Sequence, residues 1–184
     1  MNYYVLIRGP MASGKTTVAE KVARTIGAEY IAIDRILDEH VQDEWEDGVM
    51  SQKNFIEANG FAAEIATGLL ESGKPVVFDG NFYWRLQIED LIERLAYPHY
   101  VFTLKASLEV CIERDRKRKK AYGMDAVKEV YRKSTEFDYG IGIDAAKPVD
   151  VMVAEIVFNL PGRPARPRSP GHGPKRAGPS QSGL

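Results

Sequence analysis

The sequence contains a single cysteine, Cys111, among its 184 residues. One cysteine excludes an internal disulfide framework and a four-cysteine zinc site, and it fits a reducing compartment. The chain also lacks any apolar run near the roughly 20 residues that span a bilayer. Residues 1–10 carry neither a cationic segment ahead of their apolar run nor a small-residue cleavage site. We therefore expect a mature, soluble, cytoplasmic protein without a membrane partner.

Acidic residues are absent from segment 161–184, which holds six Pro, five Gly, four Arg and one Lys. This segment has too little apolar surface to offset the entropy lost on ordering, so we predict a disordered tail. The remaining unit, 1–160, has the size of one domain and carries 20 basic against 26 acidic residues. Its net negative charge argues against a protein that coats nucleic acid.

Short apolar runs alternate with longer amphipathic segments along 1–160, the pattern of β-α-β units around a parallel sheet. The sequence therefore predicts an α/β fold, a three-layer sandwich with a five-stranded parallel sheet. The polar segment 34–50 shows no regular pattern. The expected strands are 3–8, 29–33, 74–78, 100–104 and 139–144, and the expected helices are 15–26, 51–72, 84–96, about fourteen residues from Ser107, 124–134 and 149–160.

The segment GPMASGKTT, residues 9–17, matches G-x-x-x-x-G-K-[ST] between a predicted strand and a predicted helix. Its two glycines permit backbone angles that aim successive N–H groups into one concavity, and the following helix adds its positive end. The lysine suits β- and γ-phosphates, and the first threonine hydroxyl suits magnesium. The sequence thus predicts that a nucleoside triphosphate with Mg²⁺ binds through Gly9, Pro10, Met11, Ala12, Ser13, Gly14, Lys15, Thr16 and Thr17.

A second acidic signal lies in PVVFDG, residues 75–80, an apolar strand that ends at Asp79. A carboxylate at such a strand end can hold magnesium directly or through water, together with Thr16. An ordinary Asp-Gly turn is the alternative for this position. The phosphate loop upstream favours the metal role.

Asp34 follows the second predicted strand, at the edge where a doubly wound sheet opens its ligand crevice. A carboxylate there can orient an acceptor hydroxyl and take its proton during phosphoryl transfer. The alternative is a helix cap without a chemical role. Asp38 lies one helical turn further on and is expected to line the same cleft.

The helix expected from Ser107 carries the basic run ERDRKRKKAYG. Most of its lysines fit a solvated face, but Arg114 and Arg118 point toward the apolar side at helical spacing. Arginines that face a phosphate site suit a lid that neutralises transition-state charge. We therefore include both as candidate catalytic residues.

Together, the phosphate loop, Asp34, Asp79-Gly80 and the arginine pair resemble the P-loop kinases of small molecules and nucleotides. That superfamily includes shikimate, gluconate, adenylylsulfate and 5′-polynucleotide kinases. The resemblance spans 1–160 and implies a sheet ordered 2-3-1-4-5, ATP with magnesium as phosphate donor, and an arginine-bearing lid. It also implies that segment 144–147 holds the adenine and that Asp34 binds or deprotonates the acceptor hydroxyl.

The segment DGNFYWRLQIEDL, residues 79–91, is also similar to the corresponding segment of adenylate kinase. Tyr83 stands where that family has a monophosphate-binding arginine, and Arg85 lies two residues on. Residues 81–84 would instead give a polar-aromatic acceptor wall, with core packing as the alternative for the aromatic rings. Segment 54–72 has no arginine, which disfavours shikimate as acceptor.

Three function classes follow from these patterns. The leading one is a kinase that transfers the ATP γ-phosphate to a hydroxyl of a small molecule, nucleoside, nucleotide or polynucleotide 5′ end. The second is a nucleotide-dependent switch or regulatory ATPase, and the third is a polynucleotide-binding module. The chain has no Asn-Lys-x-Asp guanine-reading motif, and the acidic body disfavours the third class. The acceptor and the oligomeric state stay open.

Overall fold

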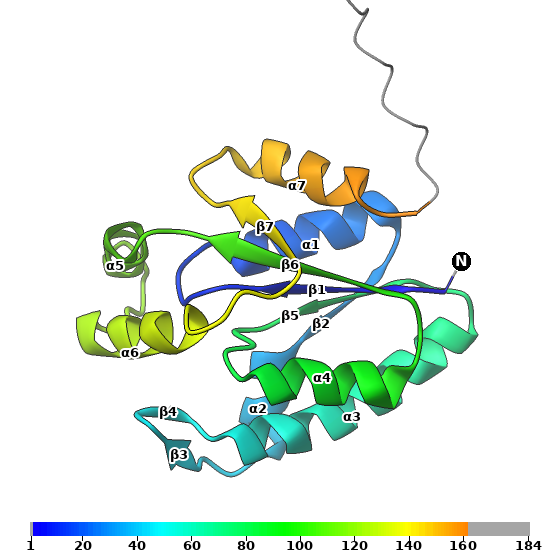
Figure 1. The fold of residues 1–184 in the computed structure, drawn as a ribbon, viewed down its shortest axis with the longest axis horizontal. Helices are drawn as coiled ribbons and strands as arrows, with labels where there is room; N and C mark the ends of the chain where they lie inside the picture. Colours follow the sequence, from blue (N-terminus) through cyan, green and yellow to red (C-terminus); the bar gives the residue numbers. More distant parts are fainter. Residues whose placement is uncertain (1, 162–184) are drawn as a thin grey trace, which may run out of the picture.

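A parallel five-stranded sheet forms the centre of the protein in a computed structural model, which describes residues 2–161 (Figure 1). Its strand order is β2-β5-β1-β6-β7, and every neighbouring pair is parallel. Counted along the chain without the hairpin strands, this is the predicted order 2-3-1-4-5. The strands are β1 (Tyr4–Arg8), β2 (Glu29–Ala32), β5 (Val76–Asp79), β6 (His99–Lys105) and β7 (Ile141–Asp144).

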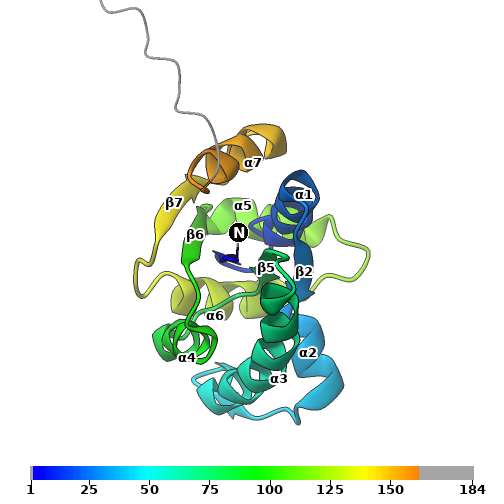
Figure 2. The same ribbon diagram turned by 90° about the vertical axis from the view of Figure 1, so that its right-hand side faces the viewer.

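Helices cover both faces of the sheet, which confirms the three-layer α/β architecture (Figure 2). One face is covered by α1 (Lys15–Ile26) and α7 (Val149–Phe158), and the other by α2 (Ile33–His40), α3 (Gln52–Glu71) and α4 (Arg85–Leu95). Two further helices, α5 (Leu108–Arg116) and α6 (Met124–Ser134), lie beyond the carboxyl ends of the strands. Among residues 2–161, no helix is long and apolar enough to cross a membrane.

The alternation of side chains along β1 produces two hydrophobic cores. Tyr4 and Leu6 pack toward α3 and α4, whereas Val5 and Ile7 pack toward α1 and α7. All four side chains are fully buried, as expected for the central strand of a parallel sheet. The two cores hold the sheet in place from both faces. The sheet in turn sets the position of the edge at which β1 and β5 end.

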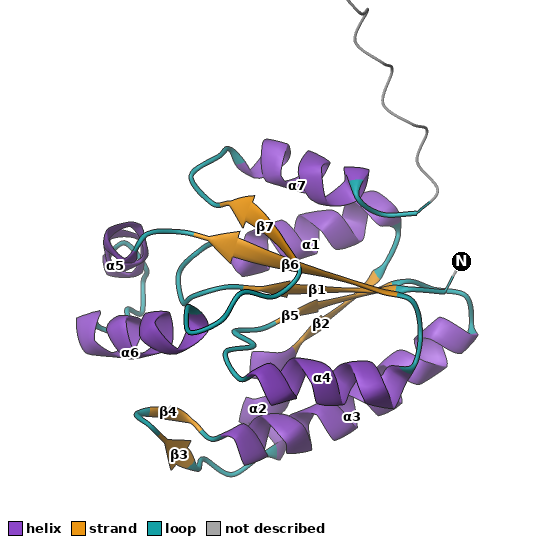
Figure 3. Ribbon diagram, in the orientation of Figure 1, coloured by secondary structure: helices purple, strands orange, loops and turns teal. Residues whose placement is uncertain are grey.

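Segment 34–50, predicted to be irregular, contains regular structure. Helix α2 buries Ile33, Ile36 and Leu37, an i, i+3, i+4 set too short to stand out in the sequence. A hairpin follows, made of β3 (Trp45–Glu46) and β4 (Val49–Met50) (Figure 3). Its turn, Asp47-Gly48, has φ of 53° and 77°, the backbone that Asp-Gly hairpin turns require.

Two predictions that concern site residues are wrong in detail. Asp34 lies in the first turn of α2 rather than at the end of a strand, because α2 begins directly after β2. The helix from Ser107 has nine residues and not fourteen, so Arg118 lies in the loop beyond it. The carboxylate of Asp115 turns the chain there by accepting hydrogen bonds from the Tyr122 and Gly123 amides.

The remaining helices confirm their predictions within a few residues. The predicted helices 15–26 and 124–134 match α1 and α6 at both ends, and the predicted helix 149–160 forms α7, which ends at Phe158. Except for Pro161, the predicted disordered tail, 161–184, lies outside the described residues.

Candidate active site

The loop between β1 and α1 has the backbone of an anion-binding nest. Gly9 has φ of 150°, and a Cβ there would lie 2.7 Å from the Leu104 carbonyl oxygen of β6, so only glycine fits. Gly14 has φ of 98° and precedes an α1 N-terminus that no side chain caps. Ala12 also takes a positive φ, 62°, at a cost of about 1–3 kcal/mol for a residue with a Cβ. Uncapped amides and stored strain fit a loop shaped for phosphate oxygens.

Lys15 is held across the mouth of this loop. Its side chain is buried, and Nζ donates to the Pro10 carbonyl oxygen at 2.9 Å and to Asn81 Oδ1 at 3.0 Å. Burial lowers the pKa of Lys15, while the charges of Asp79 and Asp34 oppose that change. The ammonium is therefore fixed in position before any ligand binds.

Thr16 and Asp79 lie side by side, as the metal-site prediction requires. Thr16 Oγ1 donates to Asp79 Oδ2 at 2.7 Å, and the hydroxyl of Tyr30 donates to the same oxygen at 3.0 Å. The other carboxylate oxygen, Asp79 Oδ1, is buried and has no hydrogen-bond partner among residues 2–161. An orphaned carboxylate oxygen beside a hydroxyl is a donor set that suits Mg²⁺, which takes few protein ligands and completes its shell with phosphate and water.

A cavity of about 340 Å³ opens beside the phosphate loop. Asp34 borders it and is a solvent-exposed residue. Partial burial of its carboxylate raises the pKa of Asp34 to about 6, although Lys15 opposes the rise; Asp79 and Asp38 add to it. The other lining residues are Met11, Ala12, Lys15, Thr16, Leu37, Asp38, Trp45, Gly48, Val49, Met50, Phe55, Asn81, Tyr83, Arg118, Tyr122, Ala126 and Val130.

The two predicted arginines occupy different places. Arg118 lines the cavity, with its guanidinium 5.6 Å from the centre of the Tyr122 ring. Arg114 does not line it; instead Arg114 Nη1 donates to the Ser13 carbonyl oxygen at 2.8 Å, and Nη2 donates to that of Ala145 at 2.9 Å. Arg114 thus joins the phosphate loop to the loop after β7.

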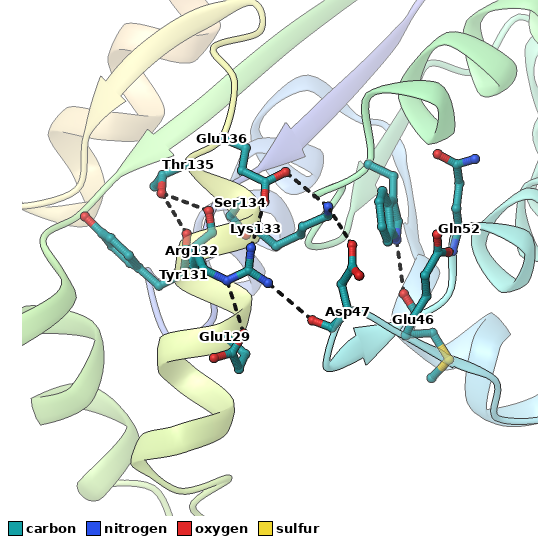
Figure 4. Close-up of polar contacts among 12 residues, drawn as sticks. Glu46, Asp47, Gln52, Glu129, Tyr131, Arg132, Lys133, Ser134, Thr135 and Glu136 are labelled. Atoms are coloured by element: carbon teal, nitrogen blue, oxygen red, sulfur yellow. Dashed lines mark hydrogen bonds and ion pairs between the residues drawn. The ribbon is translucent and has the colours of Figure 1, made fainter.

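A cluster of polar contacts, here called the strap, connects the β3–β4 hairpin to α6 across the cavity (Figure 4). Lys133 Nζ lies 3.6 Å from an Asp47 carboxylate oxygen and 3.8 Å from the centre of the Trp84 ring. Arg132 Nη2 donates to the Asp47 carbonyl oxygen, and Trp84 Nε1 donates to that of Met50. The strap holds two cavity walls together that are distant in the sequence.

A protein-family profile described as an AAA domain matches residues 5–137, which include the phosphate loop, Asp34 and Asp79. The chain belongs to this family. Its fold is that of the P-loop kinases, as the resemblance in the sequence implied. No curated protein matches the chain.

Solved structures similar to this AAA domain share its fold at low sequence identity. A sugar kinase from Janibacter sp. HTCC2649 has a TM-score of 0.71 at 20% identity, over 84% of this chain and 92% of that one. A gluconokinase from Sinorhizobium meliloti 1021 has a TM-score of 0.65 at 18% identity, over 84% and 89%. The tunicamycin resistance protein of Deinococcus radiodurans has a TM-score of 0.63 at 16% identity, over 85% and 94%.

Three site residues of the AAA domain escaped the sequence analysis. Tyr30 holds Asp79, Asp115 shapes the loop that carries Arg118, and Trp45 lines the cavity. Tyr30 comes from the strand beside Asp79, so a polar aromatic side chain near a strand end was the available signal. The available signal for Asp115 was an acidic side chain within a basic run, because an aspartate can accept hydrogen bonds from the backbone amides of a turn.

Proposed function

We propose that this protein is a kinase that transfers the γ-phosphate of ATP to a hydroxyl group of a small molecule. One observation carries the proposal: the phosphate loop and Asp34 line one cavity, and Thr16 of that loop is hydrogen-bonded to Asp79. The fold of the similar sugar kinase and gluconokinase structures agrees with it. A switch protein needs the first two features, but a carboxylate of raised pKa beside a cavity suits proton transfer.

The phosphate loop and metal residues would bind the donor. The amides of segment 9–17 donate to phosphate oxygens, and the Lys15 ammonium neutralises charge on the β- and γ-phosphates. Thr16 Oγ1 and Asp79 hold Mg²⁺, which polarises the transferring phosphoryl group when bound. Arg114 keeps the loop after β7, residues 144–147, against the phosphate loop, and we assign adenine contact to this segment.

Asp34 would act on the acceptor. Its carboxylate accepts a hydrogen bond from the acceptor hydroxyl, orients the oxygen toward the γ-phosphorus, and takes the proton as the new O–P bond forms. A pKa of about 6 keeps the group ionised at neutral pH yet more basic than an ordinary aspartate. Arg118 faces the same cavity and stabilises negative charge on the phosphoryl group in transit. Arg114, which contacts the Ser13 carbonyl oxygen of the phosphate loop, is assigned the same role from the donor side.

An acceptor screen with ATP labelled at the γ-phosphate tests the proposal. We expect label in a phosphorylated small molecule, and no transfer by Lys15→Ala. Label that appears only as free phosphate, with every sugar, nucleoside, amino alcohol and 5′-hydroxyl oligonucleotide tried, would contradict the kinase and favour the regulatory ATPase.

A further inference from the structure

The charges that line the cavity are divided between its two ends. Lys15 and Arg118 are its two cations, and the proposed function commits both to the donor phosphates. Asp34 and Asp38 are its two anions, and both come from α2. A bound Mg·ATP brings about two net negative charges, which the two cations balance. With the donor in place, the two carboxylates therefore leave the acceptor end of the cavity negative.

Both carboxylates on α2 lack a partner. Within residues 2–161, neither Asp34 nor Asp38 forms a side-chain hydrogen bond or an ion pair, and both are exposed. Residues four apart on a helix project from the same face, with their Cβ atoms roughly 6 Å apart. Asp34 is assigned to the acceptor hydroxyl, which leaves Asp38 without a task in phosphoryl transfer.

Two exposed aromatic residues line the same cavity. Trp45, from the hairpin, is 67% exposed, and Tyr122, from the loop before α6, is 62% exposed, with the Arg118 guanidinium 5.6 Å from its ring centre. An aromatic ring attracts a cation through the negative potential of its face, and Trp does so most strongly. Rings and carboxylates that share one cavity form the usual chemistry for recognition of an ammonium group.

Two further cations near the cavity are not available to bind a negatively charged acceptor. Lys133 is already engaged by Asp47, Glu136 and the Trp84 ring, and it does not line the cavity. Arg85 lies over the rings of Phe137 and Tyr139 and likewise stays outside the lining. A phosphorylated or carboxylated acceptor would thus face two carboxylates and the triphosphate without a cation of its own.

We propose that the acceptor is an amino alcohol, a molecule that carries both the phosphorylated hydroxyl and a protonated amine. Asp38 binds the ammonium group beside the aromatic rings, and Asp34 receives the hydroxyl proton. The hydroxyl oxygen forms a bond to the γ-phosphorus while the bond from that phosphorus to the β,γ-bridging oxygen breaks and ADP leaves. This inference rests on the proposed kinase function and adds the charge and the second functional group of its substrate.

Matched acceptors that differ only at nitrogen test the inference. Panels of aromatic, aliphatic and sugar-based amino alcohols, with phenylalaninol as the reference, are compared with their N-acetyl and N-succinyl derivatives. Transfer of labelled phosphate gives kcat/KM for each. We expect the free amines to exceed the N-acetyl derivatives about 10-fold or more, the size of a charged hydrogen bond, and the anionic derivatives to be poorest.

The variant Asp38→Asn ties the preference to one residue. We expect the ratio of amine to N-acetyl kcat/KM to fall to about one in Asp38→Asn and to stay unchanged in Glu39→Gln, whose side chain lies on α2 outside the cavity lining. An unchanged ratio in Asp38→Asn, or transfer only to neutral or anionic acceptors, would overturn this inference and leave the kinase standing. Binding of Mg·ATP without transfer to any member of the panels would overturn this inference, whereas label that appears only as free phosphate in the broader acceptor screen would overturn the kinase as well.

Discussion

At the scale of single residues, Asp34 carries the chemical step. Loss of solvent around this carboxylate raises its pKa to about 6. A base must be ionised to accept a proton, so kcat should rise as the pH passes upward through about 6 and then level off. Below that pH the carboxyl group is protonated and cannot accept a proton, so kcat should decrease as the pH falls.

Asp34→Asn removes this base without a change in side-chain size. We expect kcat to fall about 10²–10⁴-fold, with the affinity for Mg·ATP retained and the rise near pH 6 lost. Steady-state rates between pH 5 and 9, with Glu39→Gln as the control, measure both effects. Full transfer by Asp34→Asn would remove the base assignment.

Asp79 tests the metal site at the same scale. Its unpartnered Oδ1 and the Thr16 hydroxyl make the only direct metal contacts assigned to the protein. Asp79→Asn should raise the Mg²⁺ concentration for half-maximal activity about 10–100-fold. Tyr30→Phe, which removes only the supporting hydrogen bond, should give a smaller rise. Equal Mg²⁺ dependence in wild type and Asp79→Asn would disprove the assignment.

Helices and strands set a second scale, at which the hairpin and α6 close the cavity. The strap brings Trp45 and Tyr122 to one cavity although 77 residues separate them in the sequence. Lys133 is its centre, because its ammonium contacts a carboxylate on the hairpin and the Trp84 ring at once. Loss of these contacts leaves the donor site untouched.

Lys133→Met should therefore raise KM for the acceptor roughly fivefold, the effect of about 1 kcal/mol, and leave KM for ATP unchanged. Lys128→Met, on the exposed face of α6, is the matched control. Steady-state kinetics with each substrate varied separately gives the two constants. Equal changes in both would show a general loss of structure instead.

The sequence was sufficient for elements with strong local patterns. The phosphate loop and α1 could be predicted because glycines, lysine and a helical apolar stripe follow one another directly. The Asp34 crevice position followed from the rule that parallel strands end at one edge. The hairpin was missed although Asp47-Gly48 is a local turn signal, because its strands have only two residues each. The early end of α5 was missed because Asp115 accepts hydrogen bonds from the Tyr122 and Gly123 amides, a contact that a helical pattern does not reveal.

At the scale of the whole molecule, Arg8 links segments that are far apart. It is fully buried at the end of β1 and donates to the carbonyl oxygens of Phe82, Ser134 and Phe137 and to the Thr103 hydroxyl. No carboxylate pairs with it among the described residues. Burial lowers its pKa to about 10, so the guanidinium stays charged at neutral pH.

Arg8→Met should destabilise the protein by roughly 3–5 kcal/mol, because several buried acceptors lose their donor together. For a chain of this size that corresponds to a fall in Tm of about 6–20 °C. Arg24→Met, at an exposed position of α1, should change Tm by little. Thermal unfolding followed by circular dichroism compares them, and equal Tm values would refute the linking role.

The account depends most on the phosphate loop as a site for a triphosphate. Isothermal titration calorimetry of the folded protein with Mg·ATP tests this directly, with Lys15→Ala and Lys128→Ala titrated alongside. We predict one binding event per chain for wild type and Lys128→Ala, and a loss of most of the affinity in Lys15→Ala. Absence of measurable heat from well-folded wild type with magnesium and any purine triphosphate would contradict the account.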